Sequence, residues 1–510
     1  MVSWFQDGTK LLVSGPAGPR DRTGIWILPL TGEMRKLQDD ASGAVPSPDG
    51  AIVAFHRGAD IWLVDASAEM PRRAISAPDG YGFVEALAWS ADSRRIAFGR
   101  RNRSGTEFTI EIYDIDTNKT RVVLSDAQLE SFYWTPDGRI IFSRWEDGRN
   151  QISSNLWEIS VDPVSNRPGA RPRRLTNWAD FDIKYLSSAR NRRVSFVRQT
   201  TASNVYVAGL LDGGSRLGDK RRLTFDEWLD WPTGWTRDSQ SLLFYSSRNG
   251  VLDVFRQSIN ENQARPIAAG QEDRSDPRMS PDGRWILYLV WAKDKGGNRT
   301  GDFKLIRKSI ADPATGTVLQ GAGYVGLAPD EPAFKRPIQF TEGYPRFRCP
   351  AVSQSACVLS EKLSDRIVFT AFDPIAGRLR QLTQVGVSRT VPSFWDLSPD
   401  GRWIAFGTSE ETSAVVRLIS LSGEPSREIS LSRSTNLMSV AWAADGKSLF
   451  VTGWASRNPP LLHVTLDGKT QLLYTAEYYL ENPVPSPDGR SLAFGEVRET
   501  GNVWIIDNLR

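Results

Sequence analysis

The chain has 510 residues, of which 40% are hydrophobic and 24% charged. A chain of this length is too long to fold around one compact core, so we expect two domains. This composition excludes an intrinsically disordered chain, which would hold fewer apolar residues and a larger net charge. The balance of 63 basic against 60 acidic residues also excludes nucleic-acid binding through bulk positive charge.

The N-terminus, MVSWFQDGTK, lacks the basic and apolar regions of a signal peptide, and no stretch approaches 18 uninterrupted apolar residues. The sequence as written therefore predicts no membrane span. Residues 1–5 leave little room for a strand before the first turn, and the chain ends after NVWIIDNLR without a further strand. Because an unpaired edge invites aggregation, we expect an upstream segment, with room for a membrane anchor, to precede this sequence.

One unit recurs from end to end: a small residue, Pro-Asp-Gly and then an apolar strand. The clearest copies are SPDGAIVAF, SPDGRWILY, SPDGRWIAF and SPDGRSLAF, and two further units have lost the turn residues but keep the strands. Asp-Gly tolerates the positive φ of a tight hairpin, so these positions are predicted to be structural turns between strands. The marker aspartates are Asp7, Asp49, Asp92, Asp137, Asp238, Asp282, Asp400, Asp445 and Asp488.

The spacing of these units predicts an all-β protein of about eleven four-stranded blades, built as tandem β-propellers. Since one ring commonly holds four to eight blades, we expect two rings. The first ring, of about six blades, is predicted over residues 1–270, and the second, of five to six blades, over residues 271–510. A Gly-, Ala- and Pro-rich stretch at residues 311–341 is interpreted as an insertion in the second ring.

The two cysteines, Cys349 and Cys357, flank the turn of one degenerate unit, on strands expected to be antiparallel neighbours. Two alternatives remain open at this point: a disulfide, or two buried thiols. A disulfide would indicate an oxidising compartment such as a periplasm.

The SPDG-plus-strand unit resembles the WD-like propeller repeat of the TolB family over nearly the whole chain. Residues 348–406, with RCPAVSQSACVLSEK, RIVFTAFDPIAGRLRQLT and FWDLSPDGRWIAF, further resemble the propeller half of bacterial multidomain regulators. In those regulators a kinase or winged-helix domain precedes a membrane anchor, and neither domain is found in this sequence. The resemblance implies a sensor or interaction module, periplasmic if it is part of such a regulator and cytoplasmic if the chain is complete as given.

Catalytic motifs are not found, and the sequence predicts no catalytic, cofactor-binding or metal-binding residue. The chain has only two histidines, His56 and His463, both in or beside apolar strands. Two histidines are too few for a multi-histidine metal centre and argue against a histidine-based catalytic triad. There is no G-x-S-x-G nucleophile elbow. A calcium role for the turn aspartates is weighed against their structural role, which we favour because the hairpin itself requires them.

Two further groups of residues have both a structural and a functional interpretation. Arginines at residues 94–103 and 171–174 could bind an acidic partner, although edge protection is the favoured interpretation. Five tryptophans stand just before the turns: Trp89, Trp134, Trp235, Trp395 and Trp442. Most of them are expected to pack between blades, and a few at a ring mouth could form the floor of a ligand site.

The sequence therefore predicts a non-enzymatic binding, sensor or scaffold module without a cofactor, which recognises a protein, peptide or cell-envelope ligand through its loop faces. The alternative is an enzyme: a propeller hydrolase or lyase, or the severed propeller of a prolyl-oligopeptidase-type peptidase. Acidic side chains that converge on one ring axis, together with a metal bound by these carboxylates in the channel, would distinguish this alternative.

Overall fold

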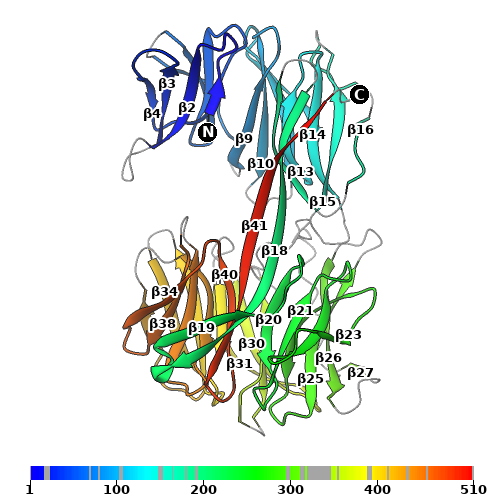
Figure 1. Cartoon of the computed structure of the whole chain (residues 1–510), viewed down its shortest axis with the longest axis vertical. Coiled ribbons are helices and arrows are strands. Elements are labelled where there is room, and N and C mark those ends of the chain that lie inside the picture. The colour runs from blue at the N-terminus through cyan, green and yellow to red at the C-terminus, as the bar shows by residue number, and fades with distance from the viewer. Residues whose placement is uncertain are drawn as a thin grey trace.

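The repeating units fold into short antiparallel strands, which the computed structural model arranges in two rings, one above the other (Figure 1). Among the residues that the structure describes, the only helical segment is one 3-10 turn, η1 (Asp212–Gly214). The described residues are 2–507 without 17–22, 68–69, 79–80, 103–106, 147–152, 163–164, 170, 179–180, 190–192, 294–298, 311–315, 319–345, 353–354, 364, 388–392, 411–412, 432–435 and 455–457.

The upper ring begins with four blades of four strands each, paired in chain order. The first two are β1 (Val2–Trp4), β2 (Lys10–Pro16), β3 (Thr23–Pro29) and β4 (Arg35–Asp39), then β5 (Ser42–Pro46), β6 (Ile52–Arg57), β7 (Asp60–Asp65) and β8 (Arg72–Ile75). The next two are β9 (Tyr81–Trp89), β10 (Arg95–Asn102), β11 (Phe108–Asp114) and β12 (Lys119–Ser125), then β13 (Leu129–Trp134), β14 (Arg139–Glu146), β15 (Ser153–Ser160) and β16 (Arg173–Arg174).

The lower ring contains five blades of the same kind. They are β20 (Asp230–Trp235), β21 (Ser241–Ser246), β22 (Asp253–Ser258) and β23 (Arg265–Ala268); β24 (Asp273–Met279), β25 (Trp285–Lys293), β26 (Arg299–Ser309) and β27 (Gly316–Val318); β28 (Arg346–Arg348), β29 (Cys357–Lys362), β30 (Arg366–Asp373) and β31 (Gly377–Gly386); β32 (Ser393–Leu397), β33 (Trp403–Glu410), β34 (Ser413–Ser420) and β35 (Arg427–Ser430); β36 (Asn436–Trp442), β37 (Ser448–Trp454), β38 (Pro460–Thr465) and β39 (Thr470–Thr475).

The remaining sheet belongs to both rings. Its long strands β18 (Arg193–Leu211) and β41 (Ser491–Ile506) pair antiparallel from Val194↔Ile506 to Gly209↔Ser491, and they cross from one ring to the other in Figure 1. In the upper ring they form the fifth blade with β17 (Asp182–Ala189), and in the lower ring they form the sixth blade with β19 (Arg216–Arg222) and β40 (Leu480–Pro485). The ten sheets therefore make eleven blades, and the fold is a tandem β-propeller.

The recurrent turn is held by its own side chains. In the unit at residues 47–52, Ser47 Oγ donates to Asp49 Oδ1 at 2.5 Å, and Asp49 Oδ1 accepts the backbone N–H of Ala51 at 3.0 Å. Gly50 has φ +73°, which a residue with a Cβ adopts only with strain. Eight of the nine marker aspartates accept the backbone N–H of the residue two positions on, which explains why aspartate recurs at this turn.

Apolar side chains pack between neighbouring blades, and these clusters show how far each ring closes. In the lower ring a buried cluster lies between every pair of neighbouring blades, including the sixth and first blades, where Val207 and Ala493 contact Trp235 and Leu242. In the upper ring clusters join the first five blades in order. No such cluster joins the fifth blade to the first among the described residues, so the upper ring has an open side.

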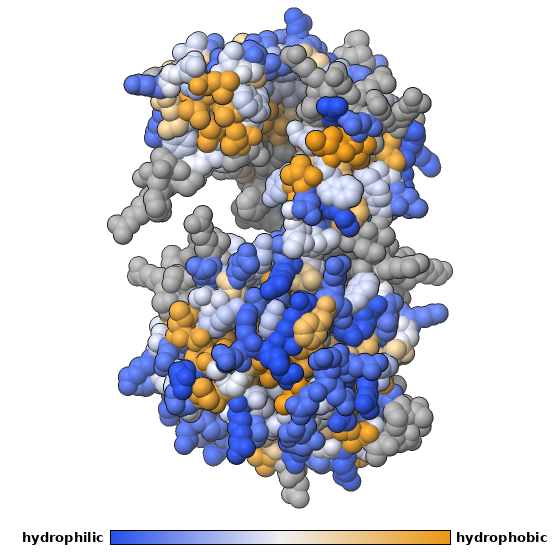
Figure 2. All heavy atoms as spheres, in the orientation of Figure 1, coloured by the Kyte–Doolittle hydropathy of each residue, from blue (hydrophilic) through white to orange (hydrophobic). Residues whose placement is uncertain are grey.

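The strands that border this open side expose apolar side chains. Val503 is 74% and Ile505 63% exposed on β41, and Val2 and Trp4 are exposed on β1. Figure 2 shows two apolar patches on the upper ring with a hollow between them. Water therefore contacts apolar strands there that a neighbouring blade would cover in a closed ring.

The predicted boundary between the rings is wrong, because the chain crosses between them twice. Residues 1–270 were expected to form the first ring, yet β20 to β23 belong to the lower ring, and the C-terminal half of β41 returns to the upper ring. The last blade also gains the fourth strand that it was expected to lack, since β19 supplies it from the middle of the chain. Most of the expected insertion at residues 311–341 lies outside the described residues, and Gly316–Val318 forms β27.

Candidate functional site

The turn aspartates predicted from the sequence lie each in its own blade and do not converge. Hydrogen bonds from Ser47 and from backbone N–H groups lower the pKa of Asp49, so its carboxylate stabilises the turn. The same hydroxyl-to-carboxylate bond recurs at Asp92, Asp137, Asp238, Asp282, Asp400 and Asp488, while Asp7 and Asp445 accept a backbone N–H two residues on. Within the described residues, no group of three or more His, Cys, Asp or Glu side chains could hold a metal ion.

The two cysteines are joined in the structure by a disulfide. Cys349 follows β28 and Cys357 opens β29, and these strands pair antiparallel with Arg348 opposite Val358. Both cysteines belong to the apolar cluster between the second and third blades of the lower ring. The disulfide thus lies in the wall of the lower ring, next to the channel described below.

Both histidines are packing residues in the structure. Burial lowers the pKa of His56 to about 4, so its imidazole is neutral. His463 is buried against Phe450, and burial lowers its pKa as well. The two lie in different rings and share no site.

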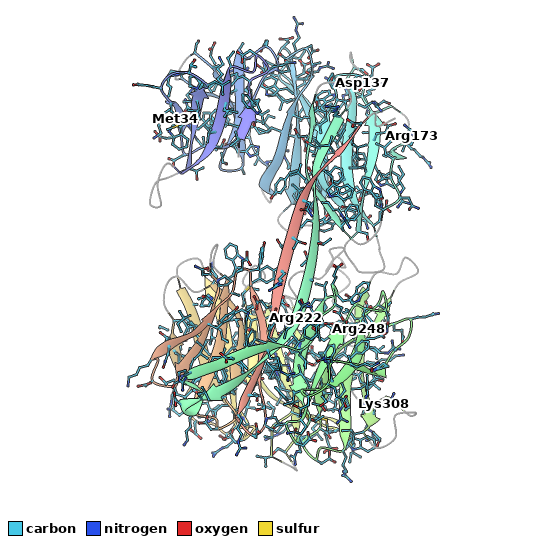
Figure 3. The ribbon with its side chains drawn as sticks, viewed as in Figure 1. Met34, Asp137, Arg173, Arg222, Arg248 and Lys308 are labelled. Atoms are coloured by element: carbon cyan, nitrogen blue, oxygen red, sulfur yellow. A yellow bond between two sulfur atoms is a disulfide. The ribbon has the colours of Figure 1, made fainter. Side chains whose placement is uncertain are left out.

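The arginine clusters lie in the upper ring, where carboxylates within the same ring pair with them. Arg95 lies 2.9 Å from Asp92, and Arg173 lies 2.6 Å from Glu158. Asp137 and Arg173 are both in the upper ring in Figure 3. The five tryptophans near the turns are all buried, and three of them donate an indole N–H to a neighbouring blade: Trp89, Trp235 and Trp395.

The central channel of the lower ring holds the group of functional residues that the sequence reasoning missed. The channel includes a cavity of about 50 Å³ for water-sized molecules, which is lined by the first strands of five blades, β24, β28, β32, β36 and β40. Its walls combine three arginines with aromatic and polar side chains, in particular Arg278, Arg346, Arg348, Trp395, Asp396 and Asn482.

The Arg278 guanidinium in the channel is incompletely neutralised. Arg348 Nε lies 2.8 Å from Asp396 Oδ1, which is a hydrogen-bonded ion pair. The Asp276 carboxylate is 3.9 Å from Arg278 and 4.0 Å from Arg348, distances too long for hydrogen bonds. Arg278 Nε is buried without a hydrogen-bond partner, although the side chain remains 17% exposed to the channel.

Burial and mutual repulsion act together on these arginines. Burial, and then the neighbouring Arg348, lower the pKa of Arg278 to about 9, while Asp276 opposes the shift. Burial also lowers the pKa of Arg346. Because Arg278 Nε is buried without a hydrogen-bond partner and the nearest carboxylate is 3.9 Å away, an anion in the channel would be stabilised.

A carboxyl group on the opposite wall adds a proton-sensitive element. Burial raises the pKa of Glu481 to about 7, against a hydrogen bond from Trp231 and the charge of Arg346. The backbone bulges where these side chains enter the channel: Asp276 has φ +53° and Asn482 has φ +45°, both in the left-handed region. Such conformations are costly for residues with a side chain and are common at binding sites.

A second cavity, of about 390 Å³, lies between the rings. Its walls are the middle of β18 and β41, the segment from Arg222 to Leu229 of the lower ring, and Phe181 of the upper ring. Arg222 and Arg248 lie near the point where the two long strands enter the lower ring (Figure 3). The volume is within the range typical of small-molecule sites.

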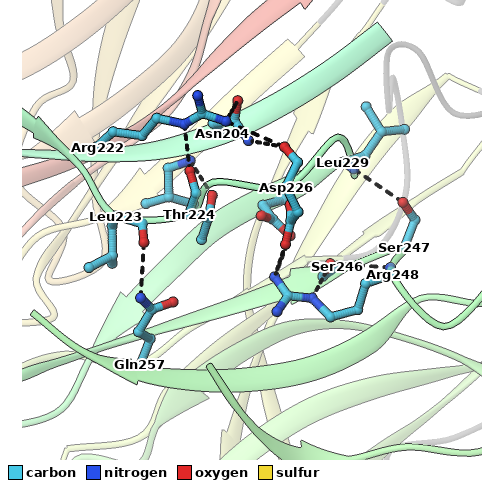
Figure 4. A network of polar contacts seen from close by, with 12 residues as sticks. Asn204, Arg222, Leu223, Thr224, Asp226, Leu229, Ser246, Ser247, Arg248 and Gln257 are labelled. Carbon is cyan, nitrogen blue, oxygen red and sulfur yellow. Dashed lines mark hydrogen bonds and ion pairs between the residues drawn. The ribbon is translucent and has the colours of Figure 1, made fainter. Parts of the chain in front are cut away.

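A buried polar network fixes the lower wall of this cavity (Figure 4). Arg222 donates to Asn204 Oδ1 at 2.7 Å and to the carbonyl of Thr224 at 2.6 Å. Arg248 Nη2 is 3.1 Å from both Asp226 Oδ2 and Asp230 Oδ1, so one guanidinium serves two carboxylates. Burial and the adjacent Asp226 raise the pKa of Asp230 to about 7.

One channel arginine, Arg278, had a signal in the sequence that the turn pattern obscured. Arg278 and Asp396 each stand two residues before the small residue of an SPDG turn, and the equivalent positions in other blades are Gly234, Ala441 and Val484. Because side chains alternate along a strand, the residue at this position points the same way in each blade, so Arg278 and Asp396 both line the channel. Aligning the units on the turn would have marked Arg278 and Asp396, but not Arg346 and Arg348, whose unit has lost the turn residues.

The fold and the channel define the class: a tandem β-propeller with arginines and carboxylates gathered in the central channel of one ring. The described residues include no helix long and apolar enough to cross a membrane. No family model matches the chain.

Curated relatives match part of the chain. An uncharacterised protein of Agrobacterium fabrum is 26% identical over 205 residues, which are 40% of this chain and 62% of that protein. The Tol-Pal system protein TolB of Francisella tularensis is 22% identical over 222 residues, which are 42% of this chain and 47% of TolB. The chain thus covers less than two thirds of either relative and is similar to TolB-like propellers.

Solved structures with β-propellers also match. The β-propeller domain of the Trilobed protease from Pyrococcus furiosus is 14% identical with a TM-score of 0.29, and the match covers 60% of this chain and 95% of that domain. Oligogalacturonate lyase from Vibrio parahaemolyticus is 12% identical with a TM-score of 0.30, over 70% of this chain and 84% of the lyase.

Proposed function

We propose that the chain is a non-enzymatic binding or sensor module that captures an anionic group of a protein, peptide or cell-envelope ligand in the central channel of the lower ring. The observation that carries this proposal is the convergence of Arg278, Arg346 and Arg348 on the channel, with one buried guanidinium nitrogen lacking a partner. Arginine binds carboxylates through two parallel hydrogen bonds, so a carboxylate fits these donors well.

The channel carboxylates are the specific observation that favours an enzyme as the second candidate. Asp276, Asp396 and Glu481 come from three blades and lie at the same channel, as an acid-base site would require. However, Asp396 accepts a hydrogen bond from Arg348 and another from the backbone of Trp442, so it is held by the protein itself. The arrangement therefore supports binding better than proton transfer.

The location and wider role follow from the same proposal. The disulfide between Cys349 and Cys357 supports an oxidising, extracytoplasmic compartment. The resemblance of residues 348–406 to regulator propellers supports a sensing role, in which a ligand bound in the channel would be reported to other domains.

The test is titration of the whole chain with a hexaglutamate peptide, followed by calorimetry, in wild type, Arg278→Gln and Arg284→Gln. Arg284 is the matched control, since it pairs with Asp282 on an exposed turn outside the channel. Losing a charged hydrogen bond should weaken binding by about tenfold to a hundredfold in Arg278→Gln and leave Arg284→Gln unchanged. Equal affinity of wild type and Arg278→Gln, with both folded by circular dichroism, would refute the proposal, and so would the absence of binding by wild type.

A further inference from the structure

The cavity between the rings has walls from both rings and from the ribbon that joins them. Phe181 precedes β17 in the upper ring, while Asn204, Trp228 and Ser247 belong to the lower ring. Between them, residues of β18 and β41 form the back wall, where Gln199 donates to Glu499 at 2.7 Å and Thr200 lies 2.7 Å from Thr500. A molecule in this cavity would contact three separate parts of the fold.

The chemistry of the walls selects the class of ligand. Phe181, Phe225 and Trp228 line the cavity, and Phe225 is 61% exposed although it is large and apolar. Arg198 lies over the Phe181 ring at 4.5 Å and Arg222 over the Phe225 ring at 5.3 Å, so each of these rings has its other face left for a ligand. The charges balance, since two arginines, Arg222 and Arg498, face two acids, Asp226 and Glu227. A pocket with no net charge gives a strong anion or cation no advantage.

The polar groups supply donors and acceptors side by side. Guanidinium and amide groups donate, whereas carboxylate and threonine oxygens accept, and Asp226 Oδ1 is a buried oxygen without a hydrogen-bond partner. Neighbouring hydroxyl groups on a ring both donate and accept, and the carbon faces of such a ring pack against aromatic side chains. We propose that the inter-ring cavity is a binding site for a hydroxyl-rich ring compound, a small saccharide.

Occupancy of this site would also fix the angle between the rings. Within the described part of the chain, β18 and β41 are the strands that cross from one ring to the other, and a two-stranded ribbon alone is twisted and only marginally stable. A saccharide held between Phe181 above and Trp228 below would order the ribbon on binding. The site therefore links ligand binding to the relative orientation of the two propellers.

The experiment measures the binding of two neutral disaccharides, chitobiose and maltose, to the full chain by calorimetry, with small-angle scattering of the same samples. We expect millimolar or tighter binding of at least one and a narrower distribution of ring-to-ring distances when it is bound. Phe225→Ala and Arg498→Ala change exposed residues, and each should weaken binding by about threefold to tenfold. Trp454→Ala, at a 45% exposed tryptophan outside the cavity, is the matched control and should bind as wild type does.

Two results would overturn the inference: no binding of either disaccharide at millimolar concentration, or equal affinity in wild type, Phe225→Ala and Arg498→Ala. The channel variant Arg278→Gln separates this site from the proposed anion site. It should bind the disaccharide as wild type does while losing hexaglutamate. If Arg278→Gln instead loses the disaccharide, the ligand occupies the channel and the inter-ring site is refuted.

Discussion

Truncation of one core phenylalanine in each ring tests whether the two propellers unfold as separate units. Phe494 is fully buried on β41 in the lower ring and stacks against Tyr206 at 6.1 Å between ring centroids. Phe196 is 2% exposed on β18 in the upper ring and stacks against Trp178 at 5.5 Å. Both residues lie on the shared pair of strands, yet each belongs to the core of a different ring.

The expected loss of stability follows from the burial of the two phenylalanine side chains. A buried Phe→Ala change leaves a cavity and costs about 3 to 5 kcal/mol of unfolding free energy. For units of this size, each kcal/mol lowers the melting temperature by about 2 to 4 °C, so each variant should lose about 6 to 20 °C. Phe494→Ala should lower the transition of the lower ring, and Phe196→Ala that of the upper ring.

Differential scanning calorimetry of the full chain measures both transitions in one experiment. Val503→Ala is the control, because Val503 is exposed on the same strand and its truncation should move neither transition. If both phenylalanine variants shift one common transition by the same amount, the rings unfold together, and the assignment of separate cores to the two halves of β18 and β41 is refuted.

Three further predictions concern the disulfide, the turns and the channel. Replacing Cys349 and Cys357 by serine opens a short loop and should cost about 2.5 kcal/mol in the chain-entropy model, measured by urea denaturation, with unchanged stability as the contrary result. The lowered pKa of Asp49 means that its stabilisation is complete above its ordinary pKa and is lost as the pH falls through the lowered folded value. Melting temperatures between pH 5 and pH 2 should therefore fall less steeply in Asp49→Asn than in wild type, and identical slopes would contradict this. Glu481, with a pKa raised to about 7, gains a negative charge in the channel as the pH rises, so hexaglutamate should bind more weakly at pH 8 than at pH 6, and Glu481→Gln should remove that dependence in calorimetry.

The sequence predicted the blades because their determinants are local. Ser47, Asp49 and Gly50 form one turn within four residues, and the same bonds recur wherever the motif does. The division of the rings was missed because it depends on a pairing without a local signal. Val194 pairs with Ile506 across more than half of the chain, and nothing in RVSFVRQTTASNVYVAGLL marks it as one strand serving two blades.

The candidate sites were missed for the same reason, because their residues are distant in the sequence and carry no local signal. A single arginine before a turn has an ordinary explanation in strand-edge protection, and only the ring brings Arg278, Arg346 and Arg348 together from two neighbouring blades. The inter-ring cavity was even less accessible to sequence reasoning, since its walls combine residues near 181, 200, 225 and 498. The channel is formed when the blades of the lower ring come together, and the cavity is formed where β18 and β41 join the two rings.

The shared ribbon also determines when these sites can form during folding. The C-terminal half of β41 completes the fifth blade of the upper ring, while its N-terminal half and β18 close the lower ring. Contacts between residues about 300 positions apart form late in folding. The fifth blade of the upper ring is therefore completed only when β41 pairs with β18, after the first four blades have formed. The channel and the inter-ring cavity both depend on this last pairing, so the ability to bind ligand at either site should appear together with the final step of folding.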